Sequence, residues 1–158
     1  MKKKLKYFLP ILCILAALAV LTLAAAAATE TGSCGTDLTY TLDTETGVLT
    51  VSGTGTHIRK PELSDSSLVR SIVISEGARV MMYDAFSDCG NLESITIPTT
   101  LVSFSARAFG SCEKLNAVHI SDLAAWAGCW FSDIEDSPLY YAHHLYLNGE
   151  LVTEVALP

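Results

Sequence analysis

Basic side chains are scarce in this sequence once its first 28 residues are set aside. Six lysines and arginines then stand against seventeen aspartates and glutamates, which gives residues 29–158 a net charge of −11. Such a surface does not attract nucleic acid or anionic lipid, because both ligands are negatively charged themselves. The composition instead suits an extracellular protein that binds no nucleic acid.

Sequence signatures of catalysis and of cofactor binding are also missing. Gly53-Thr-Gly55 follows a predicted strand, but no helix opens after it, so it is not a phosphate-binding loop. The residues that could be drawn as a zinc site are Cys112, Cys129, His143 and His144. Their spacing matches no compact zinc-binding arrangement, and Cys129 with His143 lacks the context of a catalytic pair. We therefore predict no cofactor, no metal and no enzymatic activity.

Residues 1–28 have the order of features found in a secretory signal peptide. Four lysines precede an almost wholly apolar stretch, residues 7–23, and a run of small residues, Ala24–Ala28, offers cleavage sites. We predict cleavage and a secreted or cell-surface location, with no membrane attachment afterwards. The apolar stretch is also long enough to span a bilayer, so an uncleaved anchor is the alternative.

The middle of the chain contains an internal repeat of 23 residues. Residues 71–93 and 94–116 align without a gap, and they agree at seven positions where chance would give about one or two. The identical pairs are Ser71/Ser94, Ile72/Ile95, Ile74/Ile97, Ala85/Ala108, Phe86/Phe109, Cys89/Cys112 and Leu92/Leu115. A third copy starts at Ala117 and then diverges.

Each repeat is predicted to form one coil of a mainly β solenoid. Ile72 and Ile74 alternate with polar or variable residues, which is the period of a strand. The Ala-Phe-x-x-Cys-x-x-Leu block that follows can face inward as one helical turn or as a tight irregular coil. A unit this short cannot bury its own apolar face, so successive coils must stack, with parallel strands about 4.8 Å apart. We expect a second short strand near Met81 and Phe104.

The repeat also carries a family resemblance. Ser94-Ile-Thr-Ile-Pro98, followed by the Ala-Phe-x-x-Cys-x-x-Leu block, resembles the BspA-like leucine-rich repeat of bacterial surface proteins. The resemblance covers nearly all of residues 33–158. It implies a leucine-rich-repeat solenoid that is secreted or surface-displayed, that binds proteins or host matrix, and that has no catalytic activity. Met81-Met82 and Phe104-Ser105 depart from the Ile-Gly usual in the family, so the turn there is expected to differ.

The sequence divides into six segments. They are a signal peptide (1–28), an N-terminal β-hairpin cap (29–56), a linker (57–70), the leucine-rich repeats (71–120), a helix-plus-hairpin insertion (121–153) and the start of a further repeat (154–158). In the insertion, Ser121 or Asp122 suits a helix N-cap, and Asn148-Gly149 suits a type I′ hairpin turn. Because the last segment ends on a bare strand, we expect a truncated form of a longer protein, or an end covered by a partner or a second copy.

Cys89 and Cys112 occupy the same repeat position, so they should lie one above the other. Stacked Cα atoms about 4.8 Å apart are within the range of a disulfide. Parallel in-register side chains point the same way, however, which favours two buried thiols. Cys34 and Cys129 have no partner that the sequence identifies.

Candidate ligand contacts lie on the strands and in the insertion. If the isoleucines face inward, Val73, Thr96 and His119 form one outward row. Aromatic residues are enriched in binding hot spots, whereas Trp126 and Tyr141 are expected to pack the insertion onto the repeats. The candidate aromatic contacts are Trp130, Phe131 and Tyr140.

These features predict an adhesin-like function. We expect a bacterial protein that binds another protein, or an extracellular-matrix ligand, by multivalent contact across a repeated face. A structural spacer that presents another domain is the alternative. Self-association through the open end of the C-terminal repeat is a further expectation.

Overall fold

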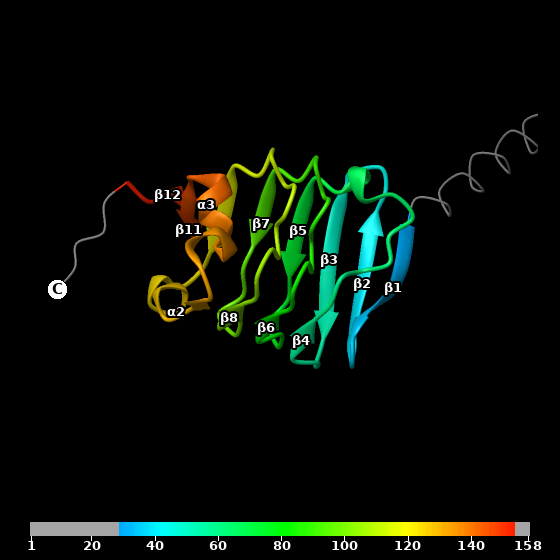
Figure 1. The fold of residues 1–158 in the computed structure, drawn as a ribbon, viewed down its shortest axis with the longest axis horizontal. Coiled ribbons are helices and arrows are strands. Elements are labelled where there is room, and N and C mark those ends of the chain that lie inside the picture. The colour runs from blue at the N-terminus through cyan, green and yellow to red at the C-terminus, as the bar shows by residue number, and fades with distance from the viewer. Residues whose placement is uncertain (1–28, 154–158) are drawn as a thin grey trace, which may run out of the picture.

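The structure, a computed structural model, describes residues 29–153 and consists mainly of strands (Figure 1). The predicted signal peptide and the predicted start of a further repeat lie outside the described residues. The larger sheet has the order β1 (Thr29–Gly35), β2 (Leu38–Asp43), β3 (Val48–Gly53), β5 (Ser71–Ile74), β7 (Ser94–Thr96), β9 (Ala117–Ile120), β11 (Leu145–Leu147), β12 (Glu150–Leu151). The smaller sheet has the order β10 (Trp130–Phe131), β8 (Ser103–Phe104), β6 (Val80–Met81), β4 (His57–Ile58).

Successive coils pair in the register that the repeat predicts. In the larger sheet, Ile72 lies opposite Ile95, and Ile95 lies opposite Val118, on parallel strands. In the smaller sheet, Met81 lies opposite Phe104, also on parallel strands. Both predicted strand rows are therefore confirmed, because residues at the same repeat position stand beside each other.

The Ala-Phe-x-x-Cys-x-x-Leu block forms a tight irregular coil. Two positions in each copy have left-handed backbone, which an α-helix of L-residues does not sustain. They are Asp84 (φ 58°) and Asp88 (φ 67°), and their equivalents Arg107 (φ 60°) and Ser111 (φ 62°). The backbone N–H groups of Phe86 and Asp88 donate across to the next coil instead, to Ala108 O and Gly110 O, both at 2.8 Å. Coil-to-coil bonds thus alternate with single-turn bonds, such as that from the Ser87 N–H to Asp84 O at 3.1 Å, and no continuous helix forms.

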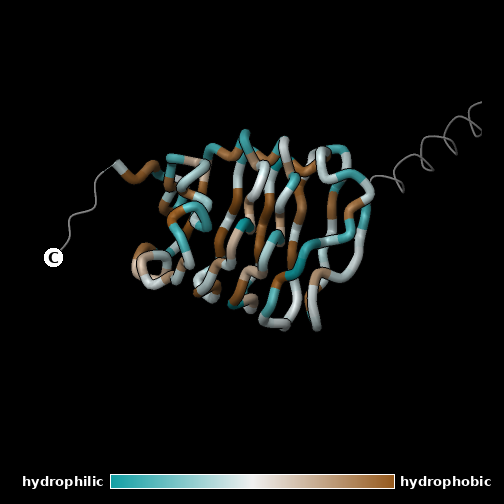
Figure 2. The backbone as a smooth tube through the Cα atoms, viewed as in Figure 1, coloured by the Kyte–Doolittle hydropathy of each residue, from teal (hydrophilic) through white to brown (hydrophobic). Residues whose placement is uncertain are grey.

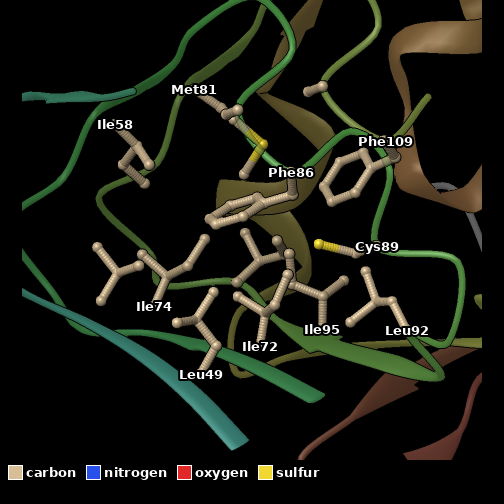
Figure 3. Packing of buried hydrophobic residues seen from close by; sticks show 14 of the residues in the cluster. Leu49, Ile58, Ile72, Ile74, Met81, Phe86, Cys89, Leu92, Ile95 and Phe109 are labelled. Atoms are coloured by element: carbon tan, nitrogen blue, oxygen red, sulfur yellow. The ribbon is translucent and has the colours of Figure 1, made fainter. Parts of the chain in front are cut away.

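The core is a stack of matching side chains (Figure 3). Phe86 and Phe109 are each 1% exposed, and their rings stack with centroids 6.3 Å apart. Figure 3 shows Ile72 and Ile95 side by side beneath Phe86, with the Cys89 thiol at the edge of this layer. This packing is the arrangement that the repeat predicted.

The repeat register begins earlier in the chain than the sequence identities indicated. Strand β3 pairs in parallel with β5, with Leu49 opposite Ile72, and β4 pairs in parallel with β6, with Ile58 opposite Met81. Residues 48–70 therefore form a first coil at the 23-residue spacing. The segment expected as a linker, 57–70, is the second half of that coil, and it includes a 3₁₀ turn at Ser66–Leu68.

The N-terminal hairpin forms as predicted but lies in the plane of the larger sheet instead of across the end of the core. Strands β2 and β3 are antiparallel, and β1 adds to the outer side of β2. A hydrophilic segment, residues 59–64, crosses the inner face of these strands (Figure 1 and Figure 2). The Arg59 N–H donates to Cys34 O at 2.7 Å, and the Tyr40 hydroxyl donates to Glu62 O at 2.8 Å. These bonds close the N-terminal end of the core.

The insertion is a longer coil followed by a hairpin. Helix α2 (Leu123–Ala127) is N-capped by Asp122, one of the two predicted caps. Trp130 then lies opposite Ser103, so this coil is four residues longer than its neighbours. A second short helix, α3 (Pro138–Ala142), follows a 3₁₀ turn at Ile134–Asp136. Strand β11 pairs in parallel with β9 and takes the place of the next repeat strand. Asn148 (φ 52°) and Gly149 (φ 87°) make the hairpin turn that joins β11 to β12.

Candidate functional site

The outward side of the larger sheet carries a continuous row of side chains. The row runs across five parallel strands, where register places each residue opposite the next: Thr50, Val73, Thr96, His119 and Tyr146. All five are half-buried, because their neighbours in the sheet cover their sides and leave their tips exposed. We call this row and its outward neighbours the strand face. The structure thus brings together the three residues predicted to form a row.

The strand face is neutral and rich in hydroxyl groups. Its members on β3, β5, β7 and β9 are Val48, Thr50, Ser52, Ser71, Val73, Ser94, Thr96, Ala117 and His119, and none carries a formal charge with histidine neutral. The hydroxyl of Ser94 donates to that of Ser71 at 3.0 Å, so these side chains are ordered by their neighbours. Desolvating such a face costs far less than desolvating a charged one.

An aromatic pair ends the row. The His119 and Tyr146 rings stack with centroids 4.9 Å apart and planes at 23°. Beside them, His119, Thr96 and Asn148 line part of a shallow hollow of about 540 Å³. Sequence reasoning missed Tyr146, although the alternation Leu145-Tyr146-Leu147 signals one outward residue between two inward ones.

The predicted aromatic contacts lie away from the strand face, on β10 and on α3. Trp130 is 61% exposed on the outer side of the smaller sheet, and Tyr140 is 45% exposed on α3. Phe131 packs inward, with its ring stacked on Phe104 at 4.9 Å. Trp126 meets the same Phe104 ring edge-on at 6.0 Å, so it packs the longer coil onto the repeats as predicted. Phe131 is therefore half-buried against the core, and its role as a contact stays a prediction.

The four cysteines of the described residues lie in the core or pack against it. Cys89 and Cys112 are buried and free, and the Cys112 thiol donates to Phe86 O at 3.2 Å. Burial raises the pKa of Cys89 to about 11 and that of Cys112 to about 12, which suppresses the nucleophilic thiolate. Burial also raises the pKa of Cys129.

In residues 29–153, no group of histidine, cysteine, aspartate and glutamate side chains is arranged to hold a metal ion. No helix in that part of the chain is long and apolar enough to cross a bilayer.

The repeat region of this chain is similar to known bacterial leucine-rich repeat proteins. A family model described as a BspA type leucine rich repeat region, six copies, matches residues 48–134, which is more than half of the chain and starts where β3 starts. A leucine-rich repeat protein from Eubacterium ventriosum ATCC 27560, solved as a crystal structure, is 19% identical with a TM-score of 0.48. The alignment covers 61% of this chain and 32% of that one, so the chain spans about a third of that protein's length. No curated protein matches.

Repeats of this type serve protein–protein interaction. The structure is mostly strands with few helices, which fits a leucine-rich repeat fold. The family model matches residues 48–134, and the strands of this region pair at a 23-residue spacing. The chain belongs to the BspA-type leucine-rich repeat family.

Proposed function

We propose that this chain is an exported bacterial surface protein that binds another protein, such as a host matrix component, through the strand face. The observation that carries the proposal is the uncharged row from Thr50 to Tyr146 across five parallel strands. A partner can dock on this row without burying an unpaired charge, and burying one would cost several kcal/mol.

The composition of the strand face supports protein recognition. Serine and threonine hydroxyls offer adaptable hydrogen bonds, while a tyrosine offers a large, rigid contact area at low entropic cost. The stacked His119–Tyr146 pair supplies such an anchor at one end of the row. Equivalent positions in successive coils, Val73 and Thr96, repeat the contact, so several weak contacts add along the face.

A pair of opposite-face variants tests the proposal. Thr96 lies on the strand face, and Ser103 lies on the outer side of the smaller sheet in the same coil. Immobilised collagen, fibronectin and fibrinogen serve as probes in surface plasmon resonance. Thr96→Arg should abolish binding because a long charged side chain blocks the row, Tyr146→Ala should weaken it at least tenfold, and Ser103→Arg should leave it unchanged. Binding that survives both strand-face changes, or no binding to any probe, would favour the spacer function.

Export is part of the same proposal. It is supported by the signal-like residues 1–28 and by the acidic remainder of the chain. The chain produced in a bacterial host should be recovered outside the cytoplasm, and N-terminal sequencing should begin close to Thr29, where β1 starts. A product that retains residue 1 and sediments with membranes would instead identify an uncleaved anchor.

A further inference from the structure

A cavity of about 130 Å³ lies between the first coil and the second coil. Leu63 and Ser66 line it from the first coil, and Ala85, Phe86 and Cys89 line it from the second. The three residues of the second coil are at most 2% exposed. The inner wall of the cavity is therefore buried and apolar.

The repeat explains why space remains at this level of the stack. Leu63 occupies the repeat position at which the next two coils have phenylalanine, and Ser66 occupies the position at which they have cysteine. Figure 3 shows Phe109 beside Phe86, and these two rings stack with centroids 6.3 Å apart. The first coil adjoins the second on its opposite side and offers a smaller side chain at both positions. The cavity thus borders Phe86 where the stack would otherwise continue with another phenyl ring.

The polar groups of the lining bond to protein atoms. Lys60 Nζ donates to Ser87 Oγ at 2.8 Å and to Asp88 Oδ2 at 2.9 Å. The Ser87 hydroxyl donates to Asp84 O at 3.1 Å, and the Ser66 hydroxyl donates to Asp88 O at 3.0 Å. Both hydroxyl hydrogens are therefore engaged. A cavity holds water only where polar groups can bond to it, so such a lining favours an apolar ligand.

The mouth of the cavity is marked by Lys60 and Asp88, which are both exposed. A lysine ammonium has three N–H donors, and Ser87 and Asp88 accept two of them. The third can donate to a neutral oxygen of a ligand. A carboxylate fits less well, because the Asp88 carboxylate already lies 2.9 Å from the ammonium and repels a second negative charge.

We propose that this cavity binds a small neutral aromatic molecule with one hydroxyl group, its ring against Phe86 and its oxygen toward Lys60. The volume suits one ring, since an apolar cavity of roughly 150 Å³ holds benzene. A ring bound there extends the stacking of Phe86 on Phe109, an arrangement that aromatic rings favour. The site is separate from the strand face, so the proposal does not depend on the proposed function.

Benzyl alcohol is the probe, because it carries one ring and one neutral hydroxyl group. The sample is the chain from residue 29 onward, which contains every described element. In an NMR titration, the signals of the Leu63 methyl groups and the Phe86 ring should shift and saturate, because both side chains line the cavity. The methyl signals of Val73, on the strand face, should not move. Naphthalenemethanol should bind at least about tenfold more weakly because of its size, and benzoate because of its charge.

Matched substitutions tie the binding to the cavity. Leu63→Phe places the ring of the repeat in the cavity, so it should weaken benzyl alcohol binding about tenfold or more. Leu68→Phe is the control, because Leu68 is also half-buried against the core but is not among the lining residues. This control should bind as the wild type does. Leu63→Ala enlarges the cavity and should admit naphthalenemethanol, which keeps the test independent of the folding of Leu63→Phe.

Three outcomes would overturn the proposal. They are signals of Leu63 and Phe86 that do not shift saturably, equal binding by the folded variants Leu63→Phe and Leu68→Phe, and a folded Leu63→Ala that still excludes naphthalenemethanol. Circular dichroism spectra and melting temperatures show which variants are folded. Because no protein partner is present, the result is independent of whether the strand face binds a matrix protein.

Discussion

Asp136→Asn is the most informative change for the longer coil. Asp136 is 4% exposed, and its two carboxylate oxygens hold two separate segments. Oδ1 accepts the Arg107 N–H of the preceding coil at 3.2 Å, and Oδ2 accepts the Asp133 N–H at 3.0 Å. Asparagine keeps the size of the side chain but turns one acceptor oxygen into an N–H₂ donor. One part-buried backbone N–H then faces another donor.

The expected destabilisation follows from the cost of a buried N–H without an acceptor, about 1–3 kcal/mol. We expect Asp136→Asn to lower the free energy of unfolding by that amount. Asp136→Ala should lower it by about 2–5 kcal/mol, because both N–H groups lose their acceptor. Against a total of about 5–15 kcal/mol for a domain, either loss is easy to measure. Glu135→Gln is the matched control, because Glu135 is the exposed neighbour and should change stability by less than about 0.5 kcal/mol.

Urea unfolding at neutral pH, followed by circular dichroism, measures these differences. Amide hydrogen exchange adds a local readout, since the Arg107 N–H should exchange faster in the variant while the Phe86 N–H, bonded to Ala108, keeps its protection. The reasoning is refuted if Asp136→Asn unfolds at the wild-type midpoint, or if Glu135→Gln is equally destabilised.

Three further predictions concern the core and its edges. Leu63→Phe should stabilise the chain by about 1 kcal/mol in thermal melts, because Leu63 borders a cavity of about 130 Å³ that the larger ring can fill. Leu63 occupies the repeat position that Phe86 occupies in the next coil. A lower melting temperature would show that residues 59–64 cannot admit the ring. Glu76→Gln should flatten the acid limb of stability. The Thr99 backbone N–H lowers the pKa of Glu76, so the stabilising contribution of the Glu76 carboxylate is present above the ordinary carboxyl pKa of 4.5 and is lost as pH falls through the lower folded value. If the free energy of unfolding falls equally steeply with pH in wild type and variant between about pH 5 and pH 3, the reasoning is contradicted. Burial raises the pKa of Cys112 to about 12, so this thiol should resist iodoacetamide at about pH 8 in the folded chain and react in urea. Mass spectrometry that finds Cys112 alkylated in the native state would disprove its burial.

Periodicity in the sequence was enough to predict the centre of the molecule. Ile72, Ile95 and Val118 line up because a 23-residue spacing returns each coil to the same place, and alternation decides which side chains face inward. The row of Val73, Thr96 and His119 follows from the same argument, since the residue between two inward ones must point outward. Its function as a binding surface stays a prediction.

The ends of the stack were decided by tertiary structure. The first coil has Leu63 and Ser66 where later coils have phenylalanine and cysteine. Its three identities with residues 71–93, Ser52/Ser75, Ser64/Ser87 and Asp65/Asp88, fall on none of the apolar motif positions, so the motif does not mark it as a repeat. Its backbone nevertheless pairs with β5 and β6, because strand hydrogen bonds join backbone groups and do not read side chains.

The same physical reason explains the last coil. Strand β11 continues the sheet without the repeat motif, since Leu145 and Leu147 satisfy the inward pattern and the edge of β9 supplies the bonds. Asp136 is buried only because the longer coil brings it to the Arg107 N–H, and Tyr146 joins the row only because β11 lies beside β9. The sequence by itself therefore determined the repeat and its inward and outward faces, which depend on local spacing. Only the tertiary structure decided where the stack starts and how its ends are built, because those depend on which backbones meet.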